Sequence, residues 1–245
     1  MSKLTEKDFI DIRKEINNGR LSPGNMRVGL GTFMFFSALA IGVAFAVAAS
    51  ASSVIGWENL SGFWQTVFKL QLILFLLQII LVFFVRGKSG WSHVLLSISY
   101  VFYTYKMVLD IYVTLSMFAM NDGVYEELSP IILIVIIGGF AFHFYLVYRS
   151  LKNKKVEANK ENEKGKSGRL IYVSLPIIFF LVSITGYIFK NEILGEYEIL
   201  FGLGICTFLF VAVLIGAVEF VKAAYCVIRF PSFRVNPPSP KKKNA

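Results

Sequence analysis

The strongest constraint in this sequence is a series of long apolar runs. A helix needs about 20 predominantly apolar residues to cross a hydrocarbon core of about 30 Å. The third and last runs have about 30 residues, so we expect them to tilt or to project beyond the bilayer. The six runs cover residues 28–54, 64–85, 91–120, 130–148, 170–189 and 199–228.

The runs are typical of transmembrane helices rather than of barrel strands. Strands of a membrane barrel alternate apolar and polar residues over about 10 positions, whereas residues 72–77 and 131–137 are continuously apolar. Hydrophobic residues make up 56% of the chain, which excludes a mostly disordered protein. The two cysteines, Cys206 and Cys226, are too few for a disulfide scaffold. We therefore expect an all-α integral membrane protein with a bundle of six transmembrane helices.

The basic residues predict which side of the membrane each loop faces. The formal net charge is +9. Most of the Lys and Arg residues lie in segments 1–27, 86–90, 149–169 and 229–245, which share one side if the chain crosses six times. Because cytoplasmic loops carry an excess of Lys and Arg, we expect both termini to be cytoplasmic. We further expect a plasma membrane, a bacterial cytoplasmic membrane being favoured. The positive charge then predicts contact with anionic lipids of the inner leaflet, and not with nucleic acid.

The cytoplasmic segment 1–27 contains a short amphipathic pattern before the transmembrane domain, residues 28–228. Phe9, Ile12 and Ile16 share one face of a helix. Two interpretations stay open. The helix lies in the interface of the inner leaflet, or it packs on the protein's own cytoplasmic end.

Two further segments lack any apolar periodicity. Residues 149–169 consist mainly of Lys, Glu and Asn, which predicts a mobile basic loop. Residues 229–245 contain prolines and, close to their end, three consecutive lysines at 241–243. This composition predicts a disordered basic tail on the cytoplasmic side.

The third run carries the strongest set of polar residues inside a span. Lys106 lies near its middle, and Asp110 is one helical turn away. Ionisable residues in a span are candidates for function. This face either lines a polar path or is a self-neutralising pair that sets helix packing. In the second run, Gln71 and Gln78 share one face and are placed to bond to the third. The polar face of the third run includes Ser99, Tyr103, Lys106 and Asp110.

Other polar residues inside the runs also have two interpretations. His143, in the fourth run, is either a hydrogen-bonded packing residue or a proton relay. Glu219 and Lys222 lie three residues apart near the end of the last run. We expect them to pair with each other or with Arg149.

Small residues form ladders at four-residue spacing on two of the runs. Such ladders let helix backbones approach closely. The partner is either another helix of this chain or another protein. The ladders are Ala38, Gly42, Ala46 and Ser50, then Ala40, Ala44 and Ala48, and in the last run Ala212 and Gly216.

The sequence lacks the motifs of membrane enzymes. There is no His-Glu-x-x-His zinc motif, no Gly-x-Ser-x-Gly nucleophile elbow and no phosphate-binding loop. We therefore expect no catalytic residues, no metal and no cofactor. The first hypothesis is a non-enzymatic accessory protein of a secretion or envelope complex, or an immunity-type protein. It would act through helix contacts with a membrane partner or a second copy. The alternative is a transport protein or permease subunit.

Overall fold

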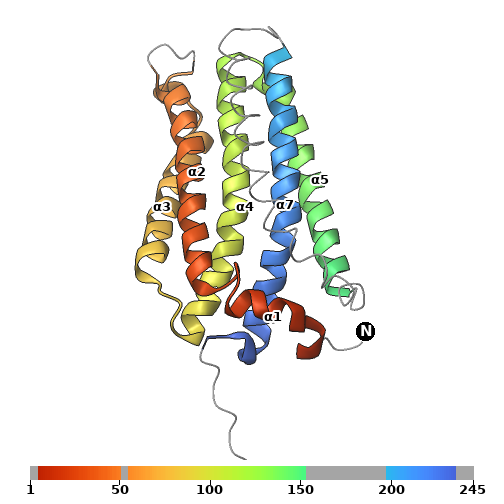
Figure 1. The fold of residues 1–245 in the computed structure, drawn as a ribbon. Coiled ribbons are helices and arrows are strands. Elements are labelled where there is room, and N and C mark those ends of the chain that lie inside the picture. The colour runs from red at the N-terminus through yellow and green to blue at the C-terminus, as the bar shows by residue number, and fades with distance from the viewer. Residues whose placement is uncertain (1–4, 51–54, 153–196, 236–245) are drawn as a thin grey trace, which may run out of the picture.

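The structure is a computed structural model, and it describes residues 5–50, 55–152 and 197–235. All regular elements in these ranges are helical, and five are long and apolar enough to cross a membrane (Figure 1). The protein is therefore a multi-pass membrane protein by the length and composition of its helices. The long helices are α2 (Pro23–Ala49), α3 (Gly62–Phe84), α4 (Gly90–Asn121), α5 (Tyr125–Lys152) and α7 (Glu198–Arg229).

The short connection between α3 and α4 shows how local sequence sets the helix ends. Gly87 has a φ of 66°, which favours glycine, and a Cβ there would collide with Pro23 at the start of α2. Ser89 then caps α4, because its hydroxyl oxygen accepts a hydrogen bond from the Ser92 backbone N–H at 3.2 Å. The turn thus places the first residues of α2 and α4 side by side.

Helix α4 is the central element of the bundle. It packs against α2 on one side and against α7 on the other, with α3 and α5 outside these two (Figure 1). A larger share of its residues is buried than in any other of the five long helices. Its polar residues therefore face protein, whereas the outer helices expose broad apolar surfaces.

Helices α5 and α7 run parallel. Leu128 packs in one cluster with Ile199 near the start of both helices, and His143 bonds to Leu214 further along both. The chain therefore leaves α5 at one end of the bundle and enters α7 at the other. The predicted span 170–189 and most of the predicted loop 149–169 lie outside the described residues, although residues 149–152 continue α5.

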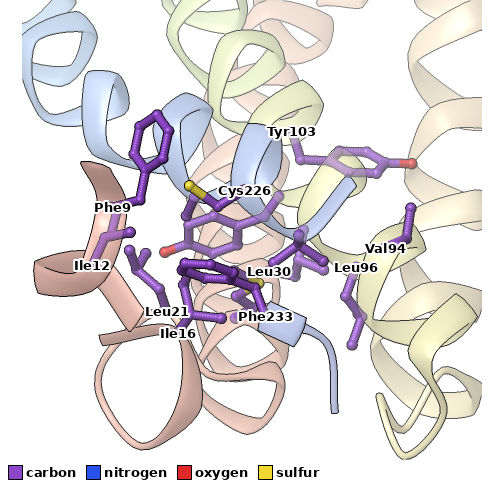
Figure 2. Packing of buried hydrophobic residues seen from close by; sticks show 14 residues of the cluster. Phe9, Ile12, Ile16, Leu21, Leu30, Val94, Leu96, Tyr103, Cys226 and Phe233 are labelled. Atoms are coloured by element: carbon purple, nitrogen blue, oxygen red, sulfur yellow. The ribbon is translucent and has the colours of Figure 1, made fainter. Parts of the chain in front are cut away.

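The amphipathic N-terminal helix packs on the protein itself. A 3-10 turn, Glu6–Phe9, leads into α1, Ile10–Asn17. The predicted apolar face, with Phe9 and Ile16, is buried among residues of α2, α4 and α7 (Figure 2). Of the two interpretations from the sequence, the structure supports the helix that packs on the end of the protein's own bundle. The apolar side chains reach the bundle, so they are not available to the acyl chains of a leaflet.

The start of the predicted disordered tail is ordered in the described part of the chain. A 3-10 turn, Pro231–Phe233, follows α7, and Phe233 inserts into the same cluster as Ile16 (Figure 2). Arg234 Nε donates to the Val227 carbonyl oxygen at 2.9 Å, near the end of α7. Proline content therefore predicted an extended segment but missed the aromatic anchor. Residues 236–245 lie outside the described residues.

We expect the packing of α1 to stabilise the whole bundle. Ile16 is 0% exposed and Ile10, in the same helix, is 60% exposed. Ile16→Ala should lower the free energy of unfolding by about 2–5 kcal/mol, since it leaves a cavity. Ile10→Ala, the matched control, should change it by less than about 0.5 kcal/mol. Thermal unfolding of both variants in detergent measures the difference, and equal shifts would contradict the packing.

Candidate functional site

A buried ion pair occupies the middle of α4. Lys106 is 7% exposed and Asp110 is 0% exposed. Lys106 Nζ donates to Asp110 Oδ2 at 2.7 Å, across one helical turn. The positive and the negative charge cancel within the pair, which reduces the cost of holding them away from water.

The pair is completed by Ser37 of α2, which is not among the polar residues predicted from the sequence. Lys106 Nζ donates to Ser37 Oγ at 2.6 Å, and Ser37 Oγ in turn donates to Asp110 Oδ2. The only signal in the sequence was one hydroxyl in an otherwise apolar stretch of α2. A single serine has no spacing that would distinguish it from the small residues around it.

Helix α3 supplies a third hydrogen-bond donor to the same carboxylate. Gln71 Nε2 donates to Asp110 Oδ1 at 2.7 Å. Asp110 thus accepts hydrogen bonds from side chains of α2, α3 and α4. Both carboxylate oxygens have partners, as a buried carboxylate requires. The sequence predicted a bond from Gln71 to this helix, and the structure places it at the ion pair.

Further hydrogen bonds join the same three helices on the α1 side of the pair. The Tyr103 hydroxyl donates to the Leu74 carbonyl oxygen of α3 at 2.9 Å. Gln78 Nε2 donates to the Leu30 carbonyl oxygen of α2 at 3.0 Å, so Gln78 bonds to α2 rather than to α4. Ser99 is buried on the polar face of α4. The predicted polar face therefore joins α4 to α2 and α3 from Tyr103 to Asp110.

A second polar centre joins α4, α5 and α7. His143 Nδ1 lies 2.8 Å from the Leu214 carbonyl oxygen, and Nε2 lies 2.7 Å from the Tyr105 hydroxyl. Because a carbonyl oxygen only accepts, Nδ1 carries the hydrogen, and Nε2 accepts from Tyr105. His143 is fully buried. Both ring nitrogens are therefore used in contacts between helices.

The charged residues near the end of α7 lie apart from these centres. Glu219 forms an ion pair with Arg20, in the connection between α1 and α2. The sequence predicted Lys222 or Arg149 as the partner of Glu219. Both side chains of the observed pair are about half exposed, so its contribution to stability is small.

The two ladders of α2 have opposite environments. Ala44 and Ala48 are fully buried in the interior of the bundle. Ala38, Gly42, Ala46 and Ser50 are exposed, as are Ala212 and Gly216 of α7. The structure therefore separates a ladder that packs within the chain from two small-residue faces that lie on the surface.

A cleft of about 450 Å³ opens between α2 and α3. Ala38 and Gly42 line one wall, and Phe68, Leu72 and Phe75 line the other. Lys106, Ser37 and Gln71 also contribute to the lining. The cleft is thus mostly apolar, with part of the buried polar network at its inner surface.

Metal-binding side chains do not cluster in the described part of the chain. No group of three or more His, Cys, Asp or Glu side chains that could hold a metal ion occurs within residues 5–50, 55–152 and 197–235. The chain matches no protein-family model, no curated protein and no solved structure. Function must therefore be argued from the arrangement of the polar network, the cleft and the exposed faces.

We expect Ser37 to be essential to the buried network. Ser37→Ala removes a donor to Asp110 and an acceptor from Lys106, so it should lower the free energy of unfolding by about 1–3 kcal/mol. Thr32→Ala is the matched control in the same helix, since Thr32 is exposed and its side chain donates to the Val28 carbonyl oxygen of its own helix. Thermal unfolding in detergent distinguishes the two. Equal stability of both variants would contradict a structural role for Ser37.

Proposed function

We propose that this protein is an accessory subunit of a membrane complex, or an immunity-type protein, that acts through helix contacts and not as an enzyme. One observation carries the proposal. The intramembrane polar groups in the described residues are largely used in bonds between helices of the chain itself, while two small-residue faces stay exposed. A polar core that holds the bundle together, with a surface suited to close helix contact, fits a binding protein.

We further propose six crossings with both termini in the cytoplasm of a bacterium. The parallel arrangement of α5 and α7 supports an odd number of crossings between them, and residues 170–189 are the apolar run available for it. The excess of Lys and Arg at the α1 end supports the orientation. In this arrangement the basic end would face anionic inner-leaflet lipids.

The α7 face is the proposed contact surface for a membrane partner. Ala212 and Gly216 are one helical turn apart and both are exposed. A Cβ at Gly216 would meet no atom within 4 Å, so an approaching backbone has room. The partner is a transmembrane helix of another protein or of a second copy, and no cofactor is needed.

A transport protein is the second candidate, and one observation favours it. Lys106 and Gln71 line the cleft between α2 and α3, which places polar groups next to a space that opens from the bundle. A transport path would require Asp110 to leave at least one of its three donors. Because both oxygens of Asp110 are bonded to donors of the bundle itself, the structure favours transport less than helix contact.

Photocrosslinking in native membranes tests the proposed contact surface. A photoreactive residue at position 212 should give one discrete adduct, and Gly216→Leu should abolish it. Gly138→Leu is the control, because Gly138 is exposed on α5 and a Cβ there meets no atom within 4 Å. The mass of the adduct distinguishes a second copy from another protein. An adduct that persists in Gly216→Leu, or no adduct at all, would contradict the proposal.

A further inference from the structure

The cleft between α2 and α3 has the length of one leaflet. On α2 it extends from Ser37 to Phe45, which is about 12 Å at a rise of 1.5 Å per residue. Half of a hydrocarbon core is about 15 Å. Trp57, in the turn between α2 and α3, lines one end of the cleft, and Lys106, near the middle of α4, lines the other. The cleft thus runs from the end of the bundle opposite α1 to its middle.

The cross-section of the cleft indicates what it can hold. The cleft has a volume of about 450 Å³ along this length, which gives room for a single hydrocarbon chain. The apolar walls, which include Ile41, Phe45 and Leu72, match such a chain in polarity.

A cation lies near the end of the cleft where the headgroup of a lipid with that chain would be. Lys69 lines the cleft, is exposed and lies seven residues after the start of α3. The two ion pairs within the described ranges do not include Lys69. A lysine near a helix end extends its ammonium group toward the interface, and Trp57 lies at the same end of the cleft, as expected for an interfacial aromatic residue. The positive charge of Lys69 therefore favours an anionic group of a membrane lipid.

We propose that the α2–α3 cleft binds one phospholipid from the leaflet at the end opposite α1, with one acyl chain between the helices and the phosphate against Lys69. Gly42 and Ala38 keep the space open, since a Cβ at Gly42 would meet no atom within 4 Å. The site is independent of the proposed partner face on α7. Loss of lipid binding and loss of the crosslinked adduct are therefore separate outcomes.

Native mass spectrometry of the full-length protein in mild detergent tests this site. The probes are phosphatidylglycerol and a diacylglycerol with the same acyl chains, which lacks the phosphate. The wild-type protein should retain one phosphatidylglycerol and much less diacylglycerol. Lys69→Gln should weaken phosphatidylglycerol binding about five-fold, the contribution of one near-surface lysine.

Variants that fill the cleft separate this site from ordinary lipid contact. Gly42→Leu should abolish the one-lipid species, and Ala38→Leu is a second variant with the same expectation should Gly42→Leu fail to fold. Gly138→Leu, on the exposed face of α5, should leave the species unchanged. Equal phosphatidylglycerol retention in the wild type and the filled variants would overturn the site. Equal binding of diacylglycerol would overturn the contact between the phosphate and Lys69.

Discussion

The buried ion pair of Lys106 and Asp110 is the interaction on which the arrangement of α2, α3 and α4 depends. Asp110 accepts from Lys106 of its own helix, from Ser37 of α2 and from Gln71 of α3. Within a bilayer the hydrophobic effect does not draw helices together, so packing and hydrogen bonds between them set their positions. A single carboxylate with donors on three helices therefore sets their rotation and depth relative to one another.

The α1 end and the outer surface of the bundle are stabilised by different environments. At the α1 end, Ile16 and Phe233 pack among residues of α2, α4 and α7, as in the core of a water-soluble protein. On the outer surface, the exposed apolar residues of α3 and α5 suit hydrocarbon. The α2–α3 cleft combines both kinds of surface, because its walls are apolar and its inner surface includes Lys106. The proposed lipid and the proposed partner occupy different helices.

The sequence predicted most of the described fold and only part of the site. Apolar length alone identified all five long helices that the structure describes, because a span needs a minimum length whatever its sequence. Periodicity could not place α1, since an apolar face with Phe9 and Ile16 suits a leaflet as well as a protein surface. It also could not tell which ladder of α2 is buried, because that choice depends on where Ser37 meets α4. The pairing of Lys106 with Asp110 could be predicted from the sequence because the two residues lie four positions apart on one helix.

The stability of single and double variants at the ion pair tests the central claim most directly. Lys106→Met or Asp110→Asn alone leaves one charge without its partner, so each should lower the free energy of unfolding by about 3–5 kcal/mol. The double variant should be more stable than the sum of the two losses predicts, since no uncompensated charge remains. If the single variants unfold at the wild-type temperature, or if their losses simply add, the ion pair does not hold the three helices together.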